Sequence, residues 1–163
     1  MKKIYFSKHE IFLTQITNNE INFSKIIKEF KQNSDKYHYT HFINNRWENI
    51  YLSPSDAPSI LPLLSNLQSI ALKLYSDTLL PHQTLIIPHD LIGYEKNEFW
   101  FNLSKKGQST RIHNHKEKSS ISGVFYLQVP KNSPNIFFKD EKDTIEIPVK
   151  EGMIIFFPSK LDH

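Results

Sequence analysis

The second half of the chain is a series of short β-type segments with no helical pattern between them. These segments are rich in β-branched and aromatic residues, are separated by turn residues, and cover residues 85–87, 99–103, 121–129, 135–138, 144–149 and 153–157. Neighbouring parallel strands would need crossover connections, usually helical. The spacing therefore predicts an antiparallel sandwich or barrel, of which a jelly-roll-like barrel is the simplest form.

The first half carries two helical patterns instead. Apolar residues recur at three- and four-residue steps over residues 23–33, which predicts a short amphipathic helix. A longer pattern covers residues 60–75, with Pro62 in the first turn, where its missing N–H is tolerated. We expect one domain of 163 residues, in which a helical N-terminal part (1–83) packs on a β core (84–163).

Composition excludes several classes of protein. The sequence has no Cys, which excludes disulfide scaffolds, thiolate-bound zinc, Fe–S clusters and thiol nucleophiles. The net charge of +3 comes from 20 basic and 17 acidic side chains that are evenly scattered, so no nucleic-acid partner is expected. An unbroken apolar stretch of membrane-spanning length and a secretion signal are both missing, so we expect a cytoplasmic protein without a membrane partner.

The His113-Asn114-His115 triplet is the first candidate for chemistry. In extended backbone, residues two apart point to the same face, so both imidazoles can converge on one metal ion. With eight His in the chain, roughly 0.4 such pairs are expected by chance, so the triplet alone is weak evidence. His163 follows a separate apolar strand and supplies a third imidazole, while the adjacent Asp162 should point to the opposite face.

The strand at residues 122–127 adds a polar group. Val124 and Tyr126 face one way along it, and Phe125 and Leu127 face the other. Tyr126 can therefore bring a hydroxyl to the inside of an otherwise apolar barrel, where a buried phenol needs a hydrogen-bond partner.

Five pieces in this order resemble the Fe(II) and 2-oxoglutarate-dependent oxygenases, specifically their small prolyl-hydroxylase-like branch. They are Phe-Trp-Phe-Asn at 99–102, the H-x-H triplet, Ser-Gly-Val-Phe-Tyr-Leu at 122–127, Gly-x-x-x-x-Phe-Pro-Ser at 152–159, and the final His. The resemblance covers residues 99–163, about two fifths of the chain.

The resemblance implies a double-stranded β-helix, a jelly-roll or cupin-like barrel, with the N-terminal helices packed on it. It implies that His113, His115 and His163 bind Fe(II), and that Tyr126 binds the distal carboxylate of the cosubstrate 2-oxoglutarate. Asn102, on the strand before the triplet, would face the same cosubstrate. No catalytic residue beyond the metal ligands is implied, and an aromatic barrel wall would limit the access of water. This wall would consist of Phe99, Phe101, Phe125 and Phe156.

Two features depart from the family pattern. His115 stands where the family usually has a carboxylate, so the metal would be held by three neutral imidazoles. The family also places an Arg or Lys beyond the distal His, whereas this sequence stops at His163 and neither Arg46 nor Arg111 matches that position. We therefore expect either that the natural end is missing or that cosubstrate binding has been lost.

Two other functions stay open. Three His without a carboxylate also suit a cupin-like metal enzyme that does not use 2-oxoglutarate, such as an isomerase. A non-catalytic β-helix binding module would explain the missing cosubstrate-binding Arg. Nothing in the sequence names the small-molecule or peptidyl substrate, and homodimerisation through the helices is also open.

Overall fold

The chain divides into two compact units. The computed structural model describes residues 1–75, 99–116, 121–141 and 143–163. The first unit combines Met1–Phe23 with Arg111–His163, and the second unit is Ser24–Thr110.

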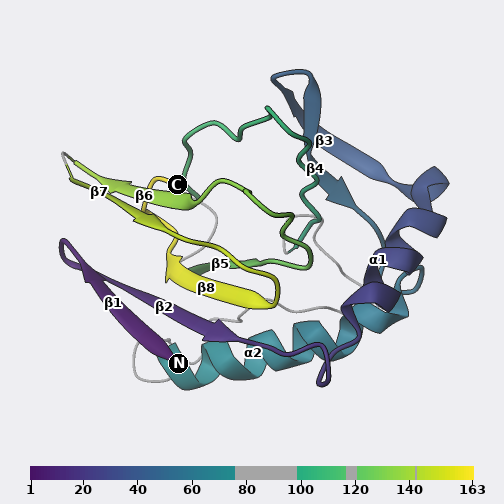
Figure 1. Ribbon diagram of the computed structural model, residues 1–163, viewed down its shortest axis with the longest axis horizontal. Helices are drawn as coiled ribbons and strands as arrows, with labels where there is room; N and C mark the ends of the chain where they lie inside the picture. The colour runs from purple at the N-terminus through teal and green to yellow at the C-terminus, as the bar shows by residue number, and fades with distance from the viewer. Residues whose placement is uncertain (76–98, 117–120, 142) are drawn as a thin grey trace. The chain divides into compact units, whose positions relative to one another are not determined.

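A four-stranded antiparallel sheet forms the frame of the first unit. Its strand order is β1-β2-β8-β5, and Figure 1 shows the four strands side by side. The strands are β1 (Lys2–Phe6), β2 (His9–Gln15), β5 (Ile121–Phe125) and β8 (Met153–Pro158). The central strand β8 is entirely apolar and buried over most of its length, as expected for a strand with neighbours on both sides.

A hairpin of β6 (Ile136–Asp140) and β7 (Asp143–Ile147) belongs to the same unit. Its buried side chains and those from one face of the four-stranded sheet form a single apolar core. The buried members of this core are Phe6, Ile11, Leu13, Phe138, Ile147, Met153, Ile155, Phe157 and Leu161. The first unit is therefore a two-layered β structure with its core between the hairpin and the sheet.

Gly152 sets the start of β8. Its φ angle is +77°, and a Cβ added there would lie 2.3 Å from the backbone oxygen of Ile16. The same backbone approach allows the Ile16 N–H to donate to the Gly152 oxygen at 2.8 Å. Only glycine satisfies both the left-handed backbone and the close contact.

The second unit contains most of α1 (Phe23–Gln32), the hairpin of β3 (His38–Ile43) and β4 (Arg46–Tyr51), and α2 (Leu61–Tyr75). Short 3₁₀ helices occur at Ser34–Lys36 and Pro58–Ile60. Its buried core consists of Phe30, Ile50, Leu52 and Ala57, with Tyr37 and Phe101 packed against it. Phe101 and Ile50 exchange two backbone hydrogen bonds of 2.9 Å, which attach the segment after residue 98 to β4.

Both predicted helices are confirmed as α1 and α2, and Pro62 lies in the first turn of α2. The N-terminal part expected to be helical also contains β1 to β4, which lie before residue 84. The β3–β4 hairpin turns at Asn44 and Asn45, whose φ angles are +51° and +59°. Two consecutive positive φ angles are what a type I′ turn requires, and Asn tolerates them. The Asn44-Asn45 pair could therefore have indicated this hairpin from the sequence.

The mainly β, antiparallel character expected for the second half is confirmed by β5 to β8. Residues 99–103 contribute only the single bridge at Phe101, and residues 85–87 lie outside the described residues. A closed barrel is not seen in the described ranges.

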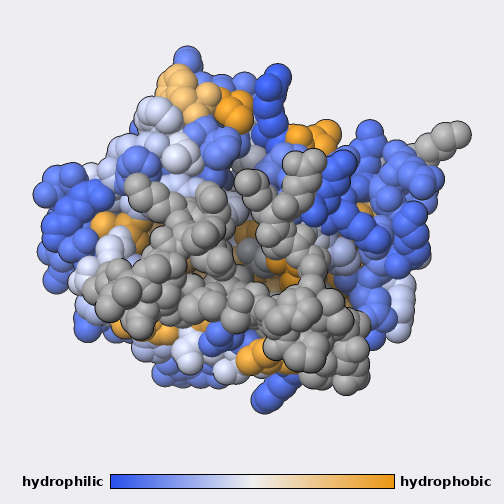
Figure 2. All heavy atoms as spheres, turned by 180° about the vertical axis from the view of Figure 1, so that it is seen from behind, coloured by the Kyte–Doolittle hydropathy of each residue, from blue (hydrophilic) through white to orange (hydrophobic). Residues whose placement is uncertain are grey.

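Figure 2 shows hydrophobic residues at several places on one face, among hydrophilic ones. Exposed aromatic side chains include Tyr39, Phe42 and Trp47 of the β3–β4 hairpin. Among the described residues, no helix has the length and apolarity needed to cross a bilayer.

Candidate metal centre

Backbone pairing brings three His together from two distant segments of the first unit. The His113 N–H donates to the His163 oxygen at 3.1 Å, and the His163 N–H donates back to the His113 oxygen at 2.9 Å. The His115 N–H donates to the Ser159 oxygen at 2.8 Å. The triplet is therefore extended and antiparallel to the last residues of the chain, so residues 113 and 115 present their side chains on one face.

The three imidazoles form a compact cluster, which we call the His triad. One potential ligand nitrogen from each lies within 4.8 Å of the others, and the ring centroids are 4.4 to 5.3 Å apart. A metal ion binds imidazole nitrogen at about 2.1 Å, so three nitrogens on one ion in a tetrahedral or facial octahedral arrangement lie about 3.0–3.4 Å from one another. Side-chain shifts of less than about 1 Å close that difference, so the donor set fits one metal ion.

Hydrogen bonds set the proton positions of two of these rings. The Nδ1 atom of His113 lies 2.8 Å from the Arg111 oxygen, and Nδ1 of His163 lies 3.0 Å from the Leu161 oxygen. A carbonyl oxygen only accepts, so Nδ1 carries the hydrogen in both rings and Nε2 keeps its lone pair. Backbone carbonyls commonly orient metal-binding His in this way.

Burial favours the neutral form of His163. Desolvation is the main cause that lowers the pKa of this imidazole to about 4, and the nearby His113 and His115 act in the same direction. The ring centroid of Phe157 lies 4.7 Å from that of His163, and the Phe138 centroid lies 6.3 Å away. At neutral pH this side chain is an uncharged nitrogen donor in an apolar setting.

The acidic neighbour of the triad is directed elsewhere. Within the described residues the cluster consists of the three His and includes no carboxylate. Asp162 instead accepts a hydrogen bond of 2.7 Å from the Asn114 Nδ2 atom. Both residues adjoin members of the triad, and strand alternation turns both to the face opposite the imidazoles. Sequence reasoning placed Asp162 on that face but did not find its partner.

Tyr126 packs against the core of the first unit. The Tyr126 N–H donates to the Met153 oxygen at 2.9 Å, so the Tyr126 backbone lies beside the first residue of β8. His163, in contrast, comes after the last residue of β8. Burial raises the pKa of the Tyr126 phenol, so the hydroxyl stays protonated. Its predicted contact with 2-oxoglutarate stays a prediction.

Asn102 lies in the second unit and is held by an arginine that sequence reasoning did not select. Arg46 is buried and donates from Nη1 to Asn102 Oδ1 at 2.9 Å and to Ser104 Oγ at 2.8 Å. Its Nη2 donates to Thr110 Oγ1. Arg46 therefore fixes the segment that carries Asn102, whose predicted role at the cosubstrate stays a prediction.

The aromatic residues beside the triad differ from those expected. Phe156 packs at Gly123, where an added Cβ would lie 3.1 Å from its ring, and Phe125 contacts Phe23 at 5.5 Å between centroids. Alternation along β8 turns Phe156 away from the face that carries Phe157. The apolar wall beside His163 is made by Phe157 and Phe138 instead.

Comparison with known proteins gives one match. The model of the family described as "Putative 2OG-Fe(II) oxygenase" matches residues 98–147, a segment that includes Asn102, His113, His115 and Tyr126 and ends before His163. Neither a curated protein nor a solved structure matches the chain. Together with the resemblance over residues 99–163, the family match supports membership of this chain in the 2OG-Fe(II) oxygenase superfamily.

Proposed function

We propose that the protein is an Fe(II)- and 2-oxoglutarate-dependent oxygenase, a hydroxylase whose iron ligands are His113, His115 and His163. The convergence of the three imidazoles within 4.8 Å carries this proposal. The family match over residues 98–147 supports it independently, because it rests on sequence rather than on side-chain positions. The fold that goes with this function is a double-stranded β-helix, to which the two-layered first unit would contribute.

The chain's own residues would prepare the site in three ways. Carbonyl groups fix the tautomers of His113 and His163, so both offer Nε2 without a proton having to leave. Phe138 and Phe157 limit the access of water on one side of His163. The Tyr126 hydroxyl, neutral through burial, would donate to the distal carboxylate of 2-oxoglutarate, and Asn102 would be a second contact.

When bound, Fe(II) and 2-oxoglutarate would supply hydroxylation of a substrate C–H bond by O₂, in which one oxygen atom goes to the substrate and the other to succinate as CO₂ is released. Three protein ligands leave positions on a six-coordinate ion for a cosubstrate that chelates through two oxygens. The substrate, whether a small molecule or a peptidyl side chain, is not specified by any of these residues.

A second function is favoured by one specific observation. Within the described residues no carboxylate joins the triad, and an all-imidazole site also suits zinc, copper or nickel. A cupin-like metal enzyme that does not need 2-oxoglutarate is therefore the alternative. A non-catalytic binding module is the third possibility, and it predicts that no metal binds.

Anaerobic titration separates these functions. Fe(II) should bind at one ion per chain, and adding 2-oxoglutarate should produce a visible metal-to-ligand charge-transfer band. His113→Ala should abolish the band, whereas His38→Ala, which removes an exposed imidazole of β3, should leave it unchanged. The protein should be expressed from its complete reading frame.

Each outcome selects one function. Metal binding without a charge-transfer band, and without succinate from 2-oxoglutarate, would favour the cupin-like enzyme. Failure to bind Fe(II), Zn²⁺ or Ni²⁺ would leave the binding module and would rule out the oxygenase.

A further inference from the structure

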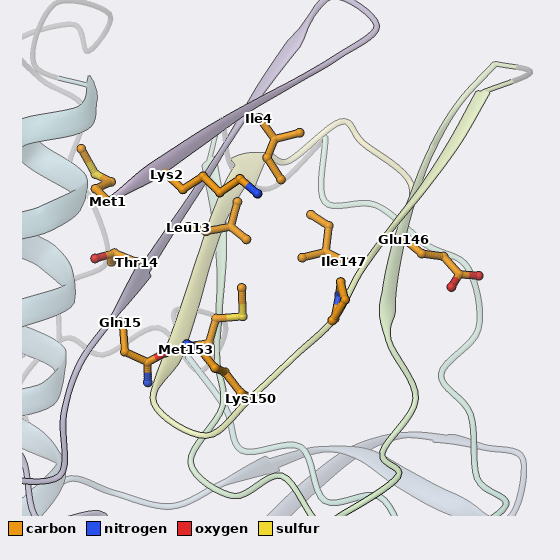
Figure 3. A pocket seen from close by; sticks show the side chains of 11 residues that line it. Met1, Lys2, Ile4, Leu13, Thr14, Gln15, Glu146, Ile147, Lys150 and Met153 are labelled. Atoms are coloured by element: carbon orange, nitrogen blue, oxygen red, sulfur yellow. The ribbon is translucent and has the colours of Figure 1, made fainter.

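The first unit has a pocket of about 560 Å³ away from the His triad (Figure 3). It lies where β1 and β8 begin, whereas His163 follows the far end of β8. Ile4, Leu13, Ile147 and Met153 give it an apolar lining from four strands. Its volume lies within the range typical of small-molecule sites.

Lys2 occupies an unusual position in this pocket. Residues 2, 4 and 6 of β1 point to one face of the sheet, and Ile4 and Phe6 contribute there to the apolar core. Lys2 pairs with Leu13 in the β1–β2 register, so its side chain starts on the core face too. Figure 3 shows its nitrogen between Ile4 and Leu13, inside the pocket. Lys2 therefore places a positive charge beside an otherwise apolar lining.

Among the described residues, no acidic side chain that lines the pocket forms an ion pair with Lys2. Glu146 is the acidic residue of the lining, but Figure 3 shows its carboxylate turned away, and it accepts a hydrogen bond of 3.2 Å from Asn135 Nδ2. A second cation, Lys150, also lines the pocket. In the described part of the chain, the six ion pairs do not include Lys2 or Lys150. The pocket thus joins an apolar lining to two ammonium groups.

The polar lining does not compete for a ligand's charge. The Gln15 amide donates to the Glu151 oxygen at 2.6 Å and so serves to join β2 to the turn before β8. Both lysines keep their side chains exposed to solvent, so an incoming anion can reach them without a large desolvation cost.

We propose that this pocket binds an aliphatic carboxylate. The hydrocarbon chain would lie against Ile4, Leu13, Ile147 and Met153, and the carboxylate would accept charge-assisted hydrogen bonds from Lys2 and Lys150. Neither half of the pocket selects this ligand alone, because an alkane leaves the cations unpaired and a small inorganic anion leaves the apolar lining exposed. The site is independent of the His triad and of the proposed oxygenase function.

The two Met of the sequence make a direct test available. Met1 and Met153 both line the pocket, so protein labelled with ¹³C at the Met methyl groups gives two reporter signals. Titration with decanoate should shift the Met153 signal saturably. Decanol, which has the same chain without the charge, should bind about tenfold more weakly.

Lys2→Gln is the decisive variant. It keeps the length and polarity of the side chain and removes the charge, so decanoate affinity should fall about tenfold while decanol affinity stays the same. Lys28→Gln, on the exposed face of α1, is the matched control and should change neither affinity. An unchanged Met153 spectrum in ligand-free Lys2→Gln protein shows that the fold is kept.

Three results would overturn the proposal: no saturable shift of Met153, equal affinity for decanoate and decanol, or unchanged decanoate affinity in Lys2→Gln. All three are independent of iron, because the titration needs no metal. If the oxygenase proposal fails, the proposal for this pocket is not affected. If the pocket binds no carboxylate, the oxygenase proposal is not affected either.

Discussion

The Nδ2 atom of Asn114 lies 2.7 Å from Oδ1 of Asp162, so the residue between two of the clustered histidines is bonded to the residue that precedes the third. This bond joins the two segments on the face opposite the imidazoles. The reciprocal backbone bonds between His113 and His163 join them along their length. Together with the bond from the His115 N–H to the Ser159 oxygen, these are four hydrogen bonds that hold the His triad in register without using its ligand atoms.

Asn114→Ala should loosen the metal site without removing a ligand. The variant leaves the half-buried Asp162 carboxylate without this donor, which should lower the free energy of unfolding by about 1–2 kcal/mol. Metal affinity should fall about tenfold, the lower end of the effect of residues that support metal ligands. Calorimetric titration with Co²⁺ and urea unfolding measure the two quantities.

A double-mutant cycle identifies the cause. If the bond itself matters, Asn114→Ala and Asp162→Ala together should cost clearly less than the sum of the single changes. Asn66→Ala, on α2 in the second unit, controls for the loss of an Asn side chain. Additive effects on metal affinity would show that Asn114 does not act through Asp162.

The shared face of His113 and His115 could be predicted because it depends on a local rule. Alternation in extended backbone places His113 and His115 on one face whatever they pair with. Strand periodicity could not predict their pairing with the end of the chain, because it says which face a residue occupies and not which strand lies beside it; the third ligand, His163, was implied by the family resemblance alone. The same limit applies to Asn102, whose main partner, Arg46, is 56 positions away.

The first two strands of the chain, β1 and β2, were not predicted, for a related reason. Lys2 and His9 interrupt the apolar alternation that indicates a strand. Lys2 takes a core-facing position beside the pocket, and His9 is buried 3.4 Å from the Asp140 carboxylate. Sequence patterns fail most readily at positions where a polar side chain has a specific task.

Gly152→Ala should destabilise the first unit strongly. Alanine would adopt an unfavourable φ of +77°, and its Cβ would meet the Ile16 oxygen at 2.3 Å, so β2 and β8 would have to separate. Gly107→Ala is the matched control, since φ there is +84° but nothing lies within 4 Å. Urea unfolding should show a loss of about 1 kcal/mol for Gly107→Ala and about 3 kcal/mol or more for Gly152→Ala. Equal losses would mean that the close contact is relieved by movement.

Arg46→Lys should disorder the segment around Asn102 although the charge is kept. The guanidinium bonds Asn102, Ser104 and Thr110 at once, and an ammonium cannot reproduce that fork. We expect a loss of about 2 kcal/mol in the free energy of unfolding and faster amide exchange after Phe101. Arg111→Lys, at the chain's other Arg, which is exposed, should have little effect on either measurement.

The stability of the metal-free protein should fall as the pH is lowered from about 6.5 to about 4, through His163. Burial lowers the pKa of this imidazole to about 4 in the folded chain, whereas the ordinary value of 6.5 applies on unfolding. Between these values the unfolded chain binds more protons than the folded chain, so acid favours unfolding. The contribution of this group should be about 3 kcal/mol over the window.

Comparison with His163→Gln isolates this contribution from the carboxylates that titrate in the same range. Gln keeps a polar side chain that does not titrate, so the difference in unfolding free energy between the two proteins should shrink as the pH falls. A bound metal ion needs His163 deprotonated and stabilises only the folded chain, so metal should steepen the wild-type dependence and leave the variant's nearly unchanged. A pH-independent difference would mean that His163 is accessible to protons in the folded chain, and that its apolar contacts with Phe157 and Phe138 do not hold it neutral.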